Sequence, residues 1–343
     1  MDKLLGKTPE ELEQVAISCG LKPFVAKQIA RWMYVSKVRS FDAMTNISKA
    51  GREKLGQLYE LGTSAPLGKA CSSDGTLKYL FKAQSSTIES VVIPDGDRST
   101  LCVSSQAGCR MNCKFCMTGR GGFHGHLQAA DILNQFISID DPDKLTNTVF
   151  MGMGEPMDNY EEVSRAIAVL TADWGFAWSP KRITVSSIGV LPELKKYLDH
   201  QKCHLAISLH NPFGEERAQM MPVEKAWPIK DVVDLIRGYD WSGQRRVSFE
   251  YTMFAGWNDT KRHADALIRL LRGMECRVNL IRFHKIPDFP YDTSAQNVME
   301  AFRDRLNSNG VTCTIRASRG EDILAACGLL AGEADKENSN YHE

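Results

Sequence analysis

A regular alternation of strand and helix patterns constrains the fold of this chain more than any other feature. Short runs rich in β-branched and aromatic residues predict strands at residues 146–152, 182–187, 204–210, 245–254, 277–283 and 312–316. Segments with apolar residues at three- and four-residue steps lie between these runs and predict helices. Strands joined through helices pair in parallel with right-handed crossovers, so we expect an α/β fold built on a parallel sheet.

The number of these units favours a partial barrel. A further strand pattern at 99–105 precedes the alternation and brings the total to about six or seven βα units. This is short of a full eight-fold barrel, so we predict a partial (βα)6-type barrel in preference to an open doubly wound sheet. In either architecture the chemistry belongs at the carboxyl ends of the strands.

The patterns outside the barrel divide the chain further. Residues 1–62 carry three helical patterns and predict a small helical N-terminal domain, while short strand patterns at 63–98 predict a β extension. We assign residues 99–330 to the barrel and residues 331–343 to a polar tail.

Charge and hydropathy limit the cellular location and the partners. The chain has 42 basic and 42 acidic residues, so any nucleic acid must bind a local basic surface. The N-terminus lacks the pattern of a signal peptide, and no apolar run approaches the roughly 20 residues of a membrane span. We therefore expect a cytoplasmic protein with no membrane contact.

Three cysteines lie close together in the stretch GCRMNCKFCMTGRGGF, at Cys109, Cys113 and Cys116. In a reducing compartment such a cluster indicates a metal or catalysis rather than disulfides. A structural zinc site needs four ligands, and His124 or His126 is near enough to supply the fourth. An iron–sulfur cluster held by only three thiolates keeps one iron open, which is a catalytic feature. We favour the cluster, with zinc as the alternative.

The C-x3-C-x2-C spacing resembles the signature of the radical S-adenosylmethionine (SAM) enzymes. This resemblance implies a 4Fe-4S cluster on the three cysteines and a partial βα barrel. It also implies that SAM binds the open iron and is split by an electron into a 5′-deoxyadenosyl radical. The segment MGMGEP resembles the Gly-Glu-Pro motif of the superfamily, which makes Gly154 and Glu155 expected SAM contacts.

Polar groups at two other strand ends are further candidates for SAM binding. They are Ser186 in TVSSIG and Ser208, Leu209 and His210 in AISLH. Such side chains could reach the ribose, carboxylate or adenine of SAM. An ordinary strand-ending turn or cap is the alternative at each position.

A longer series of motifs resembles one family of radical SAM enzymes. The motifs are TLCVSSQAGC, GCxxxCxFCMTG, MGMGEP, AISLH, VSFEYTM, VNLI and RGEDILAACG, in this order, preceded by KPFVAKQIARWMY in the helical unit. They resemble the bacterial dual-specificity methyltransferases that act on carbon 2 of adenosine in 23S ribosomal RNA and transfer RNA. The resemblance covers nearly the whole chain.

The resemblance also implies a mechanism that uses two SAM molecules per turnover. One methylates Cys327, and the second gives the radical that takes a hydrogen from the new S-methyl group. The resulting methylene radical adds to the adenine, and Cys102 then attacks the sulfur, which leaves a transient Cys102–Cys327 disulfide. Glu89 maps to the acceptor of the carbon-2 proton. His284 stands where the family often has an asparagine that contacts SAM.

Partners and alternatives follow from the same resemblance. It implies an electron donor such as a flavodoxin-type protein, and we expect a monomer. Related antibiotic-resistance enzymes methylate carbon 8 and share the cysteines, but Pro156 and Arg319-Gly320 favour carbon 2. A non-catalytic metal-binding protein that interacts with RNA is an alternative from another class. Candidate phosphate contacts are Arg98, Arg110, Lys114, Arg120, Lys181-Arg182 and Arg245-Arg246, although each could be an ordinary surface charge.

Overall fold

The computed structural model describes residues 1–83, 86–243 and 245–331. Within these ranges the main feature is a ten-stranded sheet. From one edge to the other its strands are β14 (Thr312–Ile315), β13 (Arg277–Arg282), β12 (Val247–Met253), β11 (His204–Ser208), β10 (Ile183–Ser187), β9 (Asn147–Phe150), β6 (Arg98–Cys102), β5 (Ser86–Asp95), β4 (Leu77–Ala83) and β3 (Gly68–Cys71).

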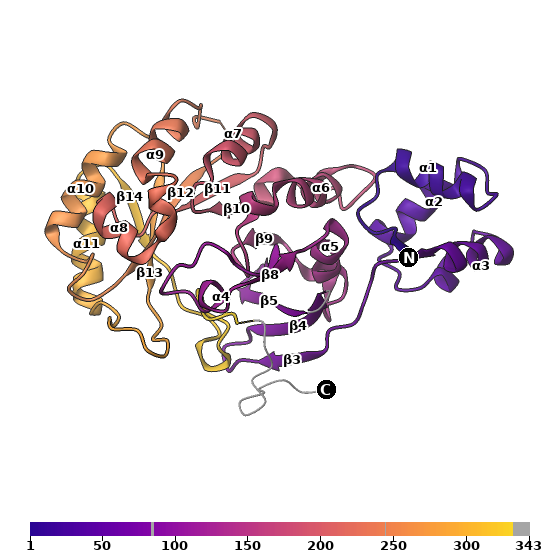
Figure 1. The fold of residues 1–343 in the computed structure, drawn as a ribbon, viewed down its shortest axis with the longest axis horizontal. Coiled ribbons are helices and arrows are strands. Elements are labelled where there is room, and N and C mark those ends of the chain that lie inside the picture. The colour runs from indigo at the N-terminus through magenta and orange to yellow at the C-terminus, as the bar shows by residue number, and fades with distance from the viewer. Residues whose placement is uncertain (84–85, 244, 332–343) are drawn as a thin grey trace.

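The sheet combines a parallel part with an antiparallel extension. All neighbours from β6 to β14 pair in parallel, whereas β3, β4 and β5 pair antiparallel and continue the sheet beyond β6. In the described part of the chain β14 and β3 form the two edges and do not pair with each other, so the barrel is open (Figure 1). The partial-barrel prediction is therefore confirmed, and each strand predicted between 146 and 316 is present.

Helices connect the parallel strands and cover the outer face of the sheet (Figure 1). They are α5 (Ala129–Ile137), α6 (Tyr160–Thr171), α7 (Leu191–His200), α8 (Gly214–Met220), α9 (Ile229–Arg237), α10 (Lys261–Leu271) and α11 (Gln296–Ser308). The sequence patterns predicted α6, α7, α9, α10 and α11, but not α5 or α8. In α5 even the polar Asn134 and Gln135 are buried, where they bond the backbone of Ser64 and Ser104, so no solvated face marks the helix.

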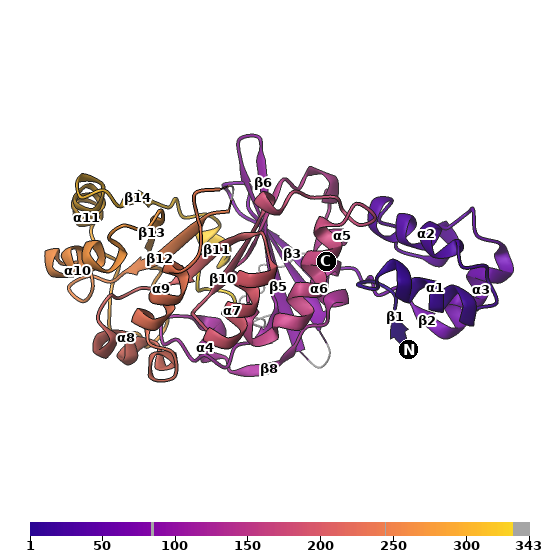
Figure 2. The ribbon, with the colours of Figure 1, turned by 90° about the horizontal axis from the view of Figure 1, so that it is seen from above.

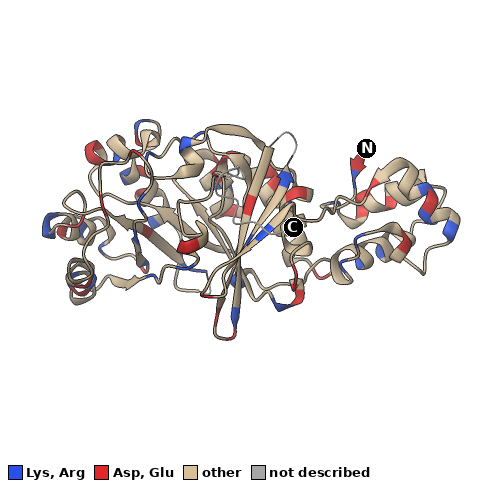
Figure 3. Ribbon diagram, turned by 90° about the horizontal axis from the view of Figure 1, so that it is seen from below, with Lys and Arg blue, Asp and Glu red and all other residues tan. Residues whose placement is uncertain are grey.

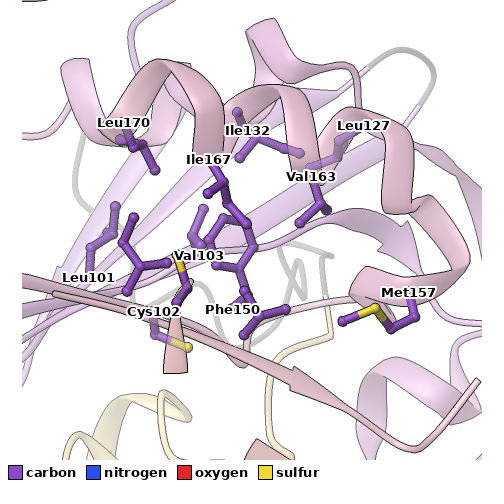
Figure 4. Packing of buried hydrophobic residues seen from close by; sticks show 14 of the residues in the cluster. Leu101, Cys102, Val103, Leu127, Ile132, Phe150, Met157, Val163, Ile167 and Leu170 are labelled. Carbon is purple, nitrogen blue, oxygen red and sulfur yellow. The ribbon is translucent and has the colours of Figure 1, made fainter. Parts of the chain in front are cut away.

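The core next to the functional region lies between β6, β9 and the helices α5 and α6 (Figure 4). The side chains of Leu101 on β6, Val103 directly after it and Phe150 on β9 are each 1% exposed or less, as are those of Ile132 and Ile167 on the helices. Burial of one such side chain contributes roughly 1.5–3 kcal/mol. Side chains alternate along a strand, so the residue between Leu101 and Val103 points away from these helices, into the barrel. That residue is a cysteine.

The N-terminal helical unit lies at one end of the molecule, beside α5 and α6 (Figures 1 and 2). Its elements are β1 (Asp2–Lys3), α1 (Pro9–Ser18), α2 (Val25–Ala30), α3 (Lys49–Leu58) and β2 (Tyr59–Glu60), and α2 continues as a π-helical turn over Arg31–Val35. Ion pairs join the unit to the barrel, from Lys3 to Asp131 at 2.6 Å and from Arg165 to Glu11 at 2.8 Å. The predicted helices are confirmed here.

Two further predictions concern membrane spans and the C-terminal tail. No helix in the described residues is long and apolar enough to cross a membrane. The predicted polar tail at 331–343 lies outside the described residues except for Ala331.

Candidate active site

The three cysteines lie in a loop that is closed at its base by a short antiparallel ladder. The ladder joins β7 (Gln106–Gly108) to β8 (Phe123–His126), and the backbone N–H of Cys109 donates to the Gly122 carbonyl at 2.7 Å. Gly108 has a φ of +71°, and a Cβ atom there would lie 2.0 Å from the Gly122 oxygen. Only glycine therefore allows this closure, which begins just after the carboxyl end of β6.

All three cysteines face one cavity at the carboxyl ends of the parallel strands. The predicted SAM residues that line the same cavity are Gly154, Glu155, Ser186, Ser208 and His210. Leu209 is fully buried and does not line it. The structure thus brings together side chains from β7–β8, β9, β10 and β11, as the parallel topology requires.

The arrangement of the cysteines fits a cluster better than a single zinc ion. Among the described residues no three His, Cys, Asp or Glu side chains are placed to hold one metal ion. Thiolates of an iron–sulfur cluster bind separate irons, so they need not converge on one point as zinc ligands must. The two histidines are engaged elsewhere, since His124 contacts the Gly121 carbonyl at 3.0 Å and His126 contacts Gln106 at 3.1 Å.

The electrostatics of the loop favour a metal centre of either kind. Burial raises the pKa of Cys109 to about 12 and that of Cys113 well above its usual range. Thiolates at these positions therefore need a strong positive charge beside them, which a metal centre supplies. Cys109, Cys113 and Cys116 are the residues that would hold a cluster.

The Gly-Glu-Pro segment is fixed tightly against β7. Gly154 has a φ of +101°, and a Cβ atom there would lie 2.6 Å from the Cβ of Gln106. The next N–H, that of Glu155, donates to the Gln106 side-chain oxygen at 2.8 Å. Glycine is therefore required for close packing against the protein itself, in addition to any approach of a ligand.

The Glu155 carboxylate joins two strand ends and also faces the cavity. It is 3% exposed and accepts from the N–H groups of Met157 and Ile188, each at 3.0 Å. Burial raises its pKa to about 7. A cationic ligand group in the cavity would favour the ionised form, so this carboxylate suits an ammonium.

His210 is held as a neutral imidazole at the end of β11. Its Nδ1 accepts from the Thr252 N–H at 2.9 Å, which leaves the proton on Nε2. Burial lowers the pKa of His210 to about 3. The ring also packs edge-on against Phe115 of the cysteine loop, with the centroids 5.0 Å apart. His210 therefore links the cysteine loop to the strand ends.

A second cavity adjoins the first, and Cys102 and Cys327 both line it. Cys327, Cys116 and Met151 line both cavities. Cys102 is 9% exposed, whereas Cys327 is exposed. The two sulfur-bearing residues are far apart in the sequence, yet the fold places them on the wall of a single cavity.

Hydrogen bonds to the cysteine loop fix the position of Cys327. The Gly328 carbonyl accepts from the Met117 N–H at 2.8 Å, and the Leu330 carbonyl accepts from the Thr118 hydroxyl at 2.6 Å. Both donors belong to α4 (Met117–Arg120), which directly follows the third cysteine. The C-terminal segment is therefore attached to the helix that directly follows the three cysteines.

Comparisons with known proteins agree with this geometry. Residues 3–61 match the model of the ribosomal RNA large subunit methyltransferase N-terminal domain, and residues 103–268 match that of the radical SAM superfamily. A probable dual-specificity RNA methyltransferase RlmN from Porphyromonas gingivalis is 56% identical over 98% of this chain and 100% of its own length. The chain belongs to the RlmN family.

More distant members extend the RlmN match. The dual-specificity RNA methyltransferase RlmN of Syntrophus aciditrophicus is 40% identical over 96% of both chains. The crystal structure of a radical SAM methyltransferase from Sphaerobacter thermophilus superposes with a TM-score of 0.93 at 35% identity, covering 97% of this chain and all of the other. The predicted family, fold and enzyme class are confirmed, and this chain is a radical SAM methyltransferase of the RlmN type.

Besides Leu209 and Cys102, the predicted residues Glu89 and His284 of the RlmN-type site lie away from the cysteine cavity. Glu89 is 2% exposed and lines neither cavity; its carboxylate pairs with Lys78 at 2.9 Å and accepts from the Ala331 N–H at 2.8 Å. His284 lines the second cavity, where its Nδ1 lies 3.2 Å from Glu321. Their roles stay predictions.

One residue that supports the RlmN-type cavity escaped the sequence analysis. Arg217 of α8 is fully buried and donates to the carbonyls of Leu209 at 3.0 Å, Ser208 at 2.9 Å and Ile188 at 3.2 Å. It also forms an ion pair with Glu224. Its sequence context, GEERAQM, reads as a charged solvent-facing helix, so no local signal marks this arginine as buried.

Replacing Arg217 should destabilise the fold. In Arg217→Met the Glu224 carboxylate stays buried without its cation, so we expect the free energy of unfolding to fall by about 3–5 kcal/mol. The double variant Arg217→Met/Glu224→Leu should recover part of this loss. Lys230→Met, which removes an exposed ion pair to Asp234, is the control and should cost at most about 1 kcal/mol. Urea unfolding measures all three, and equal losses in both single variants would contradict the prediction.

The buried imidazole of His210 should make stability depend on pH. Its pKa is about 3 in the folded protein against 6.5 in the unfolded chain, so the unfolded chain binds more protons as the pH falls below 6.5. Between pH 7 and pH 5 we expect this residue to cost on the order of 2 kcal/mol of stability. His210→Asn keeps an acceptor without the titration and should show a smaller loss over that interval in urea unfolding. Equal losses for the two proteins would refute the assignment.

Proposed function

We propose that this protein methylates carbon 2 of adenosine in 23S ribosomal RNA and in transfer RNA through an S-methylcysteine at Cys327. The observation that carries the proposal is the position of Cys327. It lines the cavity of the three cysteines and also the cavity that contains Cys102. A methyl carrier must reach SAM on one side and the RNA base on the other, and this position suits both.

The chemistry of the substrate explains the need for such a carrier. Carbon 2 of adenine has no nucleophilic lone pair, so it cannot displace the methyl group of SAM directly. The 4Fe-4S cluster and SAM, when bound, supply a radical that can activate a methyl group. Cys327 first accepts the methyl group from one SAM, and a second SAM then serves the radical step, which gives two SAM molecules per turnover.

The chain's own groups would position SAM. Glu155 offers a buried carboxylate for the ammonium group, and Ser186, Ser208 and His210 line the same wall. Arg217 holds the carbonyls at the strand ends so that this wall keeps its shape. His284, in the neighbouring cavity, remains a proposed SAM contact in place of the family's usual asparagine.

Cys102 is proposed to release the product. Burial raises its pKa to about 12, so it is a thiol at neutral pH and needs activation before it attacks the sulfur of Cys327. Arg316 lines the same cavity and its charge opposes this rise in the pKa. Glu89 is proposed to accept the carbon-2 proton, and its hydrogen bond to Ala331 places it beside the segment that carries Cys327.

The substrates and partners are proposed from the family. The relatives are named dual-specificity RNA methyltransferases, which supports ribosomal and transfer RNA as substrates. We assign the helical domain, residues 1–62, to RNA docking, because its family model is that of a ribosomal RNA methyltransferase. We further propose that residues 63–98 form a β extension between this domain and the barrel. We also propose that a flavodoxin-type protein donates the electron, and that the protein is a cytoplasmic monomer.

Methylation at carbon 8 is the alternative within the same chemistry. The Arg319-Gly320 pair favours carbon 2 and shapes the segment before Cys327. Gly320 has a φ of +63°, and a Cβ atom there would lie 2.8 Å from the Cβ of Ala325. Its N–H donates to Asp74 at 3.0 Å, which fixes the turn that leads to Cys327.

The two catalytic cysteines should fail in different ways. Cys327→Ala should form no S-methylcysteine and no methylated RNA, because it has no methyl carrier. Cys102→Ala should accumulate a covalent protein–RNA adduct, because nothing releases the sulfur. Cys71→Ala, which changes an exposed cysteine outside both cavities, is the control and should behave as the wild type.

Denaturing gels, nuclease digestion and mass spectrometry read out these variants. Free Cys102→Ala protein with normal multiple-turnover product would remove the proposed role of Cys102. Mass analysis of the modified nucleoside distinguishes carbon 2 from carbon 8.

Reconstitution tests the cofactor. After anaerobic incubation with iron and sulfide, we expect a brown protein with four irons that converts SAM to 5′-deoxyadenosine when a strong reductant is added. Changing Cys113 to Ala should abolish both the colour and the product. A colourless protein with tightly bound zinc would instead support the non-catalytic alternative.

A further inference from the structure

The barrel has a second opening at the end opposite the cysteines, and basic side chains line it. This cavity lies at the amino ends of the parallel strands, and we call it the amino-end mouth. Its basic residues that lie at or just before strand starts are Arg98, Lys181, Arg246 and Arg277. All four are exposed.

The topology explains why these distant residues converge. Arg98 begins β6 and Arg277 begins β13, while Lys181 and Arg246 lie just before β10 and β12. Parallel strands all begin at the same end of the barrel, so side chains at their amino ends lie around that end. Nothing in the local sequence around any one of them indicates this ring.

Within the described part of the chain, the four cations lack acidic partners. None of them forms an ion pair with a carboxylate there, whereas exposed lysines on the outer helices do, such as Lys195 with Asp199. Two glutamates also line the mouth. The Glu250 carboxylate accepts hydrogen bonds from Ser248 and Asn279 and pairs with Arg316. The second glutamate is Glu275.

The positive charge around the mouth affects the pKa of a neighbouring histidine, His204. His204 lines the mouth, and its pKa is lowered first by burial and then by the charges of Arg246, Lys181 and Arg245. A local cluster of cations of this kind suits a polyanion. The protein as a whole has no net charge, and acidic and basic residues are interspersed along the ribbon (Figure 3). The mouth is therefore a local feature.

In each of the basic pairs Lys181-Arg182 and Arg245-Arg246, which the sequence suggested as phosphate contacts, the two residues have different surroundings. Arg245 has a structural role, because it donates to the Leu198 carbonyl at 2.9 Å and its guanidinium lies 5.1 Å from the centre of the Trp241 ring. Arg182 lies over the ring of Trp178 at 5.7 Å. Their neighbours Arg246 and Lys181 line the mouth instead.

The mouth is continuous with the catalytic region. Arg98 and Arg316 line the mouth and also the cavity of Cys102 and Cys327. Residues of β6 and residues after β14 both line that cavity. Two arginines are therefore common to the cavity of Cys102 and Cys327 and to the amino-end mouth.

We propose that the amino-end mouth binds the phosphate backbone of the substrate RNA, flanking the nucleotide that is methylated. This rests on the proposed function. Guanidinium groups match phosphate oxygens in pairs, and three of the four cations are arginines. The continuity with the catalytic cavity favours the same RNA molecule over a separate acidic protein.

Salt-dependent RNA binding tests the proposal on the reconstituted full-length protein. The probe is a 23S ribosomal RNA fragment that contains the target adenosine and extends on both sides of it. For the wild type and for Lys181→Gln/Arg246→Gln, the dissociation constant is measured over a series of salt concentrations. We expect the double variant to bind at least about tenfold more weakly at low salt. The slope of log K against log salt should fall by about 0.7–0.9 for each phosphate that the variant no longer neutralises.

Two control proteins separate charge from folding. Lys225→Gln/Arg269→Gln removes two exposed cations elsewhere and should keep the wild-type slope. Lys181→Arg/Arg246→Lys conserves charge and should restore most of the slope, which a merely structural role would not predict.

The outcomes distinguish this inference from the proposed function. An unchanged slope in Lys181→Gln/Arg246→Gln, in a preparation whose wild type methylates the RNA, overturns the RNA site alone. Slower reduction by an acidic electron donor with unchanged RNA binding would also overturn it and assign the mouth to that protein. A wild type that cannot methylate the RNA refutes the proposed function instead.

Discussion

Parallel pairing of the strands from β6 to β14 is the constraint on which the rest of this molecule depends. It places the carboxyl ends of these strands at one end of the barrel, where the cysteine loop, the Gly-Glu-Pro segment and the end of β11 meet. It also places the amino ends of these strands at the opposite end of the barrel, where the basic residues meet. One hydrogen-bonding pattern therefore produces two chemically different ends, a cavity lined by the three cysteines and a basic opening that suits a polyanion.

Buried polar groups then hold the first of these ends in shape. Glu155 joins the segment after β9 to the segment after β10, and Arg217 joins the segments after β10 and β11. Each of these groups would be costly to bury alone, and each is satisfied by backbone partners. The loop region proposed to bind SAM thereby gains a rigid frame without regular secondary structure.

The position of Cys327, the proposed methyl carrier, depends on a third kind of contact, between the segment after Cys116 and the C-terminal segment. The bonds from Met117 to Gly328 and from Thr118 to Leu330 attach the C-terminal segment to the turn after the cluster ligands. Cys327 cannot move far from Cys116 while these bonds last. The proposed methyl carrier and the proposed radical source are in this way parts of one local unit, and Cys102 reaches that unit from β6.

The sequence by itself determined what depends on neighbours along the chain. The strand and helix patterns between 146 and 316 and the cysteine spacing are local, since period and spacing act within a few residues. The motif series also identified the family, because it preserves local words in order. Prediction failed where burial reverses the usual meaning of a residue. The polar Asn134 and Gln135 are buried in α5, and Arg217 is fully buried in a helix that reads as solvent-facing.

Only the tertiary structure decided which distant residues share a cavity. It placed Cys102 on the wall of the same cavity as Cys327, gave the neighbours Lys181 and Arg182 different surroundings, and set Glu89 against Ala331. These relations depend on strand order and on the path of the chain between strands. Residue type and spacing do not encode them, because contacts between remote segments form only when the whole sheet and its covering helices pack together.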